Sequence, residues 1–130
     1  MTDAAVRLLV VDDDPLQVEL VQRGLARDGF EVRGVTRFAD LALEAQRFAP
    51  VVVLLDVNMP DAPESDMIGA VRAAAPGARV VLYSAWEDAK LRVLVRQLGA
   101  DGFISKSESV MAIGRRLHEL QRGSRHGTTE

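Results

Sequence analysis

The stretch VVVLLDVNMP, residues 51–60, joins a run of branched apolar side chains to one acid, Asp56, and reaches a proline at Pro60. A short continuous apolar run is typical of a strand that is covered by helices on both faces. The acid stands at the point where such a strand would end. The stretch therefore predicts a buried central strand that brings a carboxylate to one edge of a sheet.

Four other short apolar runs have the same character. They are VRLLVV (6–11), EVRGV (31–35), RVVLYS (79–84) and GFIS (102–105), with VVVLLD at 51–56 between them. Segments of helical period separate the runs, and such alternation predicts a parallel sheet. Because parallel crossovers are right-handed and connections are short, few topologies remain. We expect an α/β fold, a flavodoxin-like (βα)5 three-layer sandwich with the five parallel strands in order 2-1-3-4-5.

The first helix is the one whose start is clearest in the sequence. Asp14 is a suitable N-cap and Pro15 suits the first turn, and we expect Leu16, Leu20 and Val21 to form its buried face. Further helices are predicted over residues 37–48, 65–74 and 87–98, and from Ser109 to about residue 121.

Composition favours one small domain. The chain has 130 residues, 48% of them hydrophobic, which suits a single core. We expect a domain over residues 1–121 and a flexible C-terminal tail or linker stub over 122–130, where the sequence becomes polar. The net charge of −3 gives no electrostatic case for nucleic-acid binding by this domain.

No apolar run reaches membrane-spanning length, and the start of the chain lacks the pattern of an export signal. The chain has no cysteine, which excludes disulfides and thiolate metal sites and suits a reducing compartment. We therefore expect a cytoplasmic protein with no membrane partner.

Polar side chains stand at the ends of four of the five predicted strands. Asp12 and Asp13 follow the first, Asp56 ends the third, Ser84 ends the fourth and Lys106 follows the fifth. Ligands of open parallel sheets bind at this edge, so we expect these side chains to converge. At a separation of about 5 Å and an effective dielectric constant near 20, two carboxylates repel by roughly 3 kcal/mol.

Lys106 and a divalent cation would balance the three acids. Oxygen ligands without histidine or cysteine favour Mg2+, with Mn2+ as an alternative, over zinc. An aspartate beside such a metal, with a hydroxyl and an ammonium group nearby, has the groups needed to accept a phosphoryl group as an acyl phosphate.

At these positions the sequence resembles the receiver domain of bacterial two-component response regulators. The resemblance rests on LLVVDDDP (8–15), LLDVNMP (54–60), VVLYSA (80–85) and GADGFISK (99–106), and it covers nearly the whole chain. It implies that Asp56 is the phosphoacceptor and that Lys106 contacts the phosphoryl group. It also implies that Asp12, Asp13, Asp56 and the backbone carbonyl of Asn58 hold the magnesium ion.

The resemblance further implies a switch and its partners. Ser84 would be the switch hydroxyl and Phe103 the switch aromatic residue. A histidine kinase or phosphotransfer protein would donate the phosphoryl group, and a downstream protein would bind the face of helix four, strand five and helix five, including Lys90, Arg92 and Arg96. A homodimer is a further option. The protein would then be a signalling switch, with only self-catalysed phosphotransfer and autodephosphorylation, and no turnover enzyme.

The sequence departs from the family in three places. Pro63–Glu64 stands where an Asp-Gly pair is usual, so the turn into the third helix must differ. Ser107 replaces the proline that usually follows the lysine. Trp86, two residues after Ser84, is a bulky side chain that we expect to slow hydrolysis of the acyl phosphate.

Two other functions stay open at this point. An adaptor could keep the fold and signal without phosphorylation, as the unusual turn and Trp86 allow. A phosphatase of the haloacid dehalogenase type also uses an aspartate nucleophile on a parallel sheet, but Asn58 stands where those enzymes have a second aspartate. Single residues also have simpler interpretations: Phe103 as plain core, Ser84 as a strand-end hydroxyl and Lys106 as a solvated side chain.

Overall fold

The structure is a computed structural model that describes residues 5–127, with the backbone alone for residue 64 and residues 121–127. The strands are β1 (Val6–Val11), β2 (Phe30–Val35), β3 (Val52–Asp56), β4 (Arg79–Ser84) and β5 (Gly102–Ser105). The helices are α1 (Pro15–Ala26), α2 (Leu41–Phe48), α3 (Glu64–Ala74), α4 (Asp88–Leu98) and α5 (Val110–Gly127), with the short 3-10 helix η1 (Phe38–Asp40) before α2.

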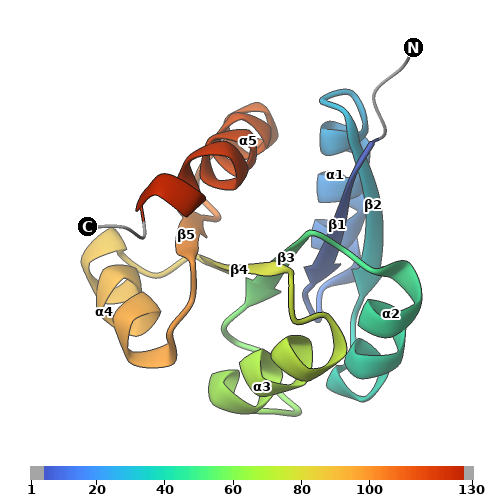
Figure 1. The fold of residues 1–130 in the computed structure, drawn as a ribbon, viewed down its shortest axis with the longest axis vertical. Coiled ribbons are helices and arrows are strands. Elements are labelled where there is room, and N and C mark those ends of the chain that lie inside the picture. The colour runs from blue at the N-terminus through green and yellow to red at the C-terminus, as the bar shows by residue number, and fades with distance from the viewer. Residues whose placement is uncertain (1–4, 128–130) are drawn as a thin grey trace.

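The five strands form one parallel sheet in the order β2-β1-β3-β4-β5 (Figure 1). This confirms the predicted fold class and strand order. The reversal of strand order lies between β1 and β3, which run side by side in the middle of the sheet. Their carboxyl ends therefore open at the topological switch point, where ligands of such sheets bind.

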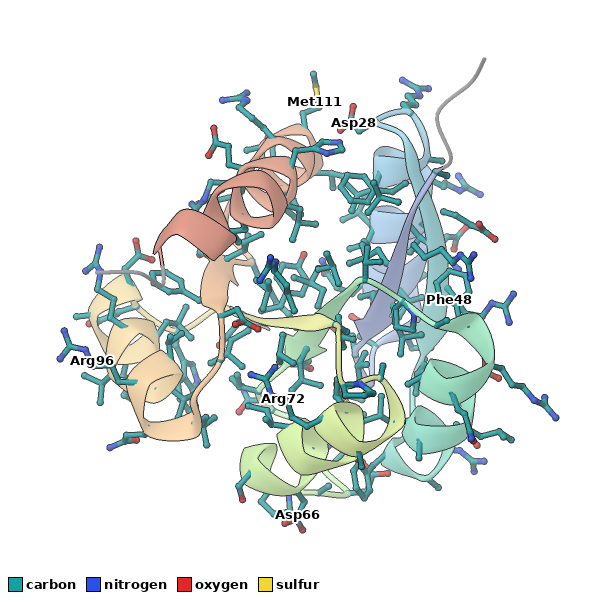
Figure 2. The ribbon with its side chains drawn as sticks, in the orientation of Figure 1. Asp28, Phe48, Asp66, Arg72, Arg96 and Met111 are labelled. Carbon is teal, nitrogen blue, oxygen red and sulfur yellow. The ribbon has the colours of Figure 1, made fainter. Side chains whose placement is uncertain are left out.

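Helices cover both faces of the sheet, as the continuous apolar strands require. One face packs against α1 and α5 through the cluster that contains Val21, Leu25, Ile113 and Leu117. The other face packs against α2, α3 and α4 (Figures 1 and 2). Along each strand alternate side chains enter opposite clusters, so the position of a residue in its strand determines which helices it meets.

The buried face of α1 agrees with the predicted one only at Val21. Val18, Val21 and Leu25 are buried, whereas Leu16 and Leu20, which were also expected on this face, are 75% and 51% exposed. The helix carries apolar residues on two overlapping stripes, and periodicity does not show which stripe meets the sheet. The start of the helix was predicted correctly, because the Asp14 side chain accepts the Leu16 N–H at 3.0 Å and Pro15 is the first helical residue.

The last helix is longer than predicted. Helix α5 continues past Gln121 to Gly127, so much of the segment expected to be a tail is helical, and residues 128–130 lie outside the described residues. Helix α3 begins directly after Pro63, whose carbonyl accepts the N–H groups of Asp66 and Met67 at 3.1 and 3.2 Å. Of the helices that the structure describes, none is both long and apolar enough to cross a membrane.

Candidate functional site

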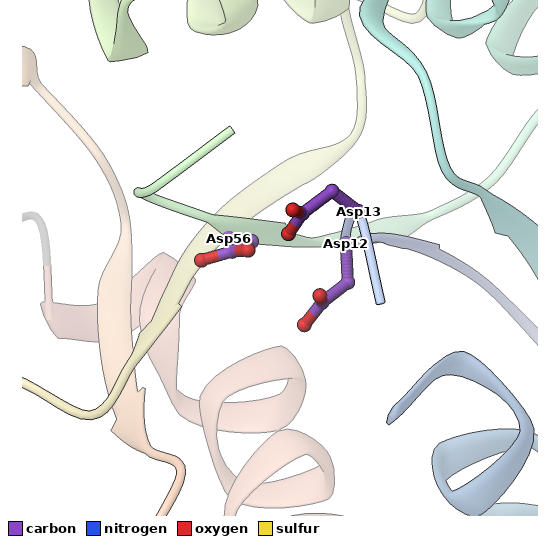
Figure 3. Close-up of side chains that lie close together, drawn as sticks. All are labelled: Asp12, Asp13 and Asp56. Atoms are coloured by element: carbon purple, nitrogen blue, oxygen red, sulfur yellow. The ribbon is translucent and has the colours of Figure 1, made fainter. Parts of the chain in front are cut away.

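Three carboxylates meet at the carboxyl edge of the sheet. In the ladder between β1 and β3, Val11 pairs with Leu55, so the next residues, Asp12 and Asp56, lie opposite each other. Asp13 follows at once in the turn into α1. Each of the three acids offers an oxygen that lies within 4.8 Å of the others (Figure 3), which confirms the predicted convergence.

The two strand-end acids are almost fully enclosed, whereas Asp13 faces solvent. Asp12 is 0% and Asp56 2% exposed. One oxygen of each is held by the following turn: Asp12 Oδ1 accepts the Asp14 N–H, and Asp56 Oδ1 accepts the Asn58 N–H, both at 3.0 Å. These backbone hydrogen bonds fix the orientation of both carboxylates.

Lys106, the residue directly after β5, extends its side chain into the same site. Its Nζ lies 2.8 Å from Asp12 Oδ2 and 3.5 Å from Asp56 Oδ1. The backbone also holds this residue, because the Lys106 N–H donates to the Ser84 carbonyl at 2.8 Å. A single ammonium group thus pairs with both buried carboxylates.

The environment shifts the proton equilibria of Asp56 and Lys106. Burial raises the pKa of Asp56 from 3.8 to about 6, and the charges of Asp12 and Asp13 add to the rise, while the Asn58 N–H and Lys106 oppose it. Burial lowers the pKa of Lys106, but the close contact with Asp12 and the charge of Asp56 more than offset it, so the net pKa is raised. Lys106 is therefore charged at neutral pH.

The donor set fits a hard divalent cation. Asp12 Oδ2 is buried and, among the described residues, accepts no well-aligned hydrogen bond, although the Lys106 ammonium lies beside it. In the part of the chain that the structure describes, the three carboxylates offer only oxygen ligands, and the Lys106 ammonium group pairs with two of them, Asp12 and Asp56. Such a set suits Mg2+ or Mn2+ and does not suit zinc.

Ser84 is the last residue of β4, and Phe103 lies in the neighbouring strand β5. The Ser84 Oγ accepts the Trp86 N–H at 3.0 Å, so the hydroxyl is held in the turn after β4. Phe103 is partly buried against the core, with the Arg92 guanidinium 5.9 Å above its ring. Arg116 of α5 donates to the Phe103 carbonyl at 3.2 Å. Phe103 therefore contacts both α4 and α5.

The loop after Asp56 is held by a side-chain contact that no local sequence pattern predicts. The side chain of Asp61 accepts the Phe38 N–H at 2.9 Å, at the first residue of η1. This bond ties the β3–α3 loop, which carries Asn58, to the loop after β2. The partners are 23 residues apart, and local patterns do not show such pairs.

A second contact that sequence reasoning missed involves Tyr83, the residue before Ser84. Its phenol oxygen accepts a hydrogen bond from Gln17 Nε2 of α1 at 2.6 Å, and Lys106 Nζ lies 5.3 Å from the centre of its ring. The alternation of side chains along β4 could have placed Tyr83 on the face of Asp56. It could not have identified Gln17 as the partner.

Comparison with known proteins agrees with this architecture. The sequence model of the family described as the response regulator receiver domain matches residues 8–118. The transcriptional regulatory protein PrrA of Mycobacterium tuberculosis is 32% identical over 123 residues, which cover 95% of this chain and 52% of PrrA. The transcriptional regulatory protein GltR of Pseudomonas aeruginosa is 32% identical over 117 residues, which cover 88% of this chain and 48% of GltR. The chain thus spans about half the length of these curated relatives.

Solved structures show the same fold. The chemotaxis response regulator CheY4 of Vibrio cholerae superimposes with a TM-score of 0.79 at 21% identity, covering 89% of this chain and 98% of CheY4. The signal receiver domain of a response regulator from Bermanella marisrubri gives a TM-score of 0.77 at 30% identity, covering 90% of this chain and 98% of that domain. With the family match over most of its length, this chain belongs to the response regulator receiver domains of two-component systems.

Proposed function

We propose that the protein accepts a phosphoryl group on Asp56 and converts this modification into a changed protein-binding surface. The observation that carries the proposal is the burial of Asp56 beside a second enclosed acid, with the Lys106 ammonium 3.5 Å from its carboxylate. A carboxylate in this position is too crowded to serve only as a solvated surface group. It has the neighbours that a nucleophile for phosphoryl transfer needs.

The donor would be a phosphohistidine of a histidine kinase or phosphotransfer protein. An oxygen of Asp56 forms a bond to phosphorus while the bond between phosphorus and the imidazole nitrogen breaks. The nitrogen keeps the bonding electron pair and takes up a proton. The product is an acyl phosphate on Asp56, which water later attacks to release inorganic phosphate and restore the carboxylate.

The side chains of Asp12, Asp13 and Asp56 and the carbonyl of Asn58 would hold a magnesium ion, with Mn2+ as a substitute. When bound, the ion would neutralise negative charge on the phosphoryl oxygens. Lys106 would supply a positive charge to the same oxygens from the β5 side. The Asn58 N–H keeps Asp56 oriented through the hydrogen bond at 3.0 Å.

Ser84 and Phe103 would transmit the modification to the partner-binding face. A phosphoryl oxygen on Asp56 would accept a hydrogen bond from the Ser84 hydroxyl, whose oxygen accepts the Trp86 N–H, and rotation of the hydroxyl toward the phosphoryl group would move the β4–α4 turn. The Arg92 guanidinium of α4 stands over the Phe103 ring and Arg116 of α5 donates to the Phe103 carbonyl, so a change in the position of Phe103 would alter the relation of α4 and α5.

The surface of α4 supplies groups for a partner. Lys90, Arg92 and Arg96 are all exposed, and Val93 adds an apolar side chain that is 53% exposed (Figure 2 labels Arg96). Val93 and Trp86 also line a surface pocket of about 550 Å³. We propose that a cytoplasmic downstream protein, or a second copy of this chain, binds here, and that any DNA contact in a transcriptional response is made outside this acidic domain.

Incubation with acetyl phosphate and magnesium tests the proposal. The intact protein should gain the mass of one phosphoryl group, and Asp56→Asn should gain none. Equal labelling of the variant would contradict the assignment of Asp56. Failure of the native protein to label from acetyl phosphate or from a phosphorylated histidine donor would favour the adaptor, whereas sustained turnover of a generic phosphate ester would favour the phosphatase.

A further inference from the structure

Tyr83 is the lateral neighbour of Asp56. In the ladder between β3 and β4 the two residues pair directly, so their side chains leave the same face of the sheet. On the other side Tyr83 pairs with Ile104, and Lys106 follows Ile104 by two residues, which returns it to that face. Asp56, Tyr83 and Lys106 thus occupy consecutive places on the face that carries α1 and α5.

The face of the Tyr83 ring is directed toward the Lys106 ammonium group. Tyr83 is 1% exposed, and the Lys106 ammonium lies 5.3 Å from the ring centre, within the range of a cation–π interaction. The phenol oxygen is anchored in turn by the Gln17 amide at 2.6 Å. The ring therefore meets Lys106 on its face and is held by Gln17 at its hydroxyl end.

A flexible lysine side chain at this position needs a neighbouring group that favours one orientation. The side chain has four flexible bonds, and ordering it costs conformational entropy. The Lys106 side chain is 23% exposed, so solvent offers an alternative to the ion pairs with Asp12 and Asp56. A ring on its buried side favours the orientation that points the ammonium to the acids.

We infer that Tyr83 is a positioning residue for the Lys106 ammonium, that Gln17 supports it, and that α1 thereby contributes to the reactivity of Asp56. The effect on reactivity rests on the proposed function, in which Lys106 contacts the phosphoryl group. The positioning itself does not depend on that function and is measured separately.

The sequence provides a sensitive test of position, because Lys90 and Lys106 are its only lysines and Tyr83 its only tyrosine. In the full chain labelled with 13C-lysine, the ε-methylene signal of Lys106 should show the upfield ring-current shift of a group above an aromatic face. Tyr83→Phe should keep this shift and Tyr83→Leu should lose it. The Lys90 signal, whose ammonium lies 5.0 Å from the Trp86 ring centre, should stay unchanged and serves as the internal control.

Reactivity is measured as the initial rate of Asp56 labelling by acetyl phosphate at saturating magnesium. Tyr83→Leu should lower the rate about 5- to 30-fold, which corresponds to about 1–2 kcal/mol. Tyr83→Phe and Gln17→Ala, which remove only the hydrogen bond, should lower it by no more than about fivefold. Val81→Ala is the matched control, because Val81 is buried in the same strand on the same face and loss of its packing should leave the rate close to native.

The two measurements separate the two ideas. A Lys106 signal that keeps its shift in Tyr83→Leu overturns the positioning role, whatever the labelling shows. A shift that is lost in Tyr83→Leu and kept in Tyr83→Phe supports it. If the native protein is labelled and Tyr83→Leu is labelled at the rate of Val81→Ala, the link between Tyr83 and reactivity is wrong. If the native protein is not labelled at all, the proposed function fails, but the lysine signal still tests the positioning of Lys106.

Discussion

Replacement of Asp56 by asparagine should stabilise the metal-free protein at neutral pH. Burial, together with the charges of Asp12 and Asp13, raises the pKa of Asp56 from 3.8 to about 6. At neutral pH Asp56 is therefore ionised in a folded environment that stabilises its protonated form more than the unfolded chain does. At 1.36 kcal/mol for each factor of ten, the difference (about 2.2 × 1.36) corresponds to about 3 kcal/mol of unfolding free energy. Asparagine removes the charge and keeps an oxygen for the Asn58 N–H.

The stability gained by Asp56→Asn should increase as the pH rises, because the pKa of Asp56 is raised in the folded protein. Because Asp56 binds its proton more tightly in the folded protein than in the unfolded chain, its contribution to stability is fully present below about pH 4. That contribution is lost as the pH rises through about 6. The two proteins should therefore be nearly equal in stability at pH 4, and Asp56→Asn should exceed the native protein by about 3 kcal/mol above pH 7.

Urea unfolding in EDTA, followed by the fluorescence of Trp86, measures the difference at each pH. Asp14→Asn is a matched control, because it removes an equal charge from an exposed N-cap that asparagine fills as well, and it should change stability by less than about 0.5 kcal/mol. Native and Asp56→Asn proteins of equal stability at pH 7.5, or a gain that is constant from pH 4 to 8, would refute the electrostatic explanation of the site.

Magnesium should raise the unfolding free energy of the native protein by about 2.7 kcal/mol at a concentration of 100 times its dissociation constant, and that of Asp56→Asn by less; equal shifts in urea midpoint would place the ion elsewhere. Gly24→Ala should lower the unfolding free energy by about 1–2 kcal/mol, because the new Cβ would lie 1.8 Å from Val110 Cγ1. Calorimetry of the double variant Gly24→Ala/Val110→Ala should show that part of this loss is recovered. Trp86→Ala should shorten the lifetime of the acyl phosphate, measured by loss of the added mass, and an unchanged lifetime would contradict a shielding role.

The strands and the acids of the site could be predicted because local chemistry specifies them. The β1 and β4 boundaries, Val6–Val11 and Arg79–Ser84, agree with the predicted ones, since continuous branched apolar runs have few other uses in a domain of this size. The convergence of Asp12 and Asp56 followed from parallel pairing alone. The roles of Ser84 and Phe103 are still predictions, because they concern a change of state.

Two predictions from the sequence were wrong, the buried face of α1 and the end of α5, and in both cases the local pattern did not carry the information. Leu16 and Leu20 form as good an apolar stripe as Val18, Val21 and Leu25, and only docking against the sheet distinguishes them. The polar end of α5 gave no apolar repeat past Gln121, although its backbone continues as a helix to Gly127.

By itself the sequence determined the fold class, the order of elements and the acids that follow the strands, because each depends on the period and chemistry of neighbouring residues. Only the tertiary structure showed that Gln17 meets Tyr83, that Asp61 holds the start of η1, and that one ammonium group pairs with both buried carboxylates. These contacts join residues far apart in the chain. Their geometry depends on strand register and helix rotation, which the packing of the whole core sets and no local pattern encodes.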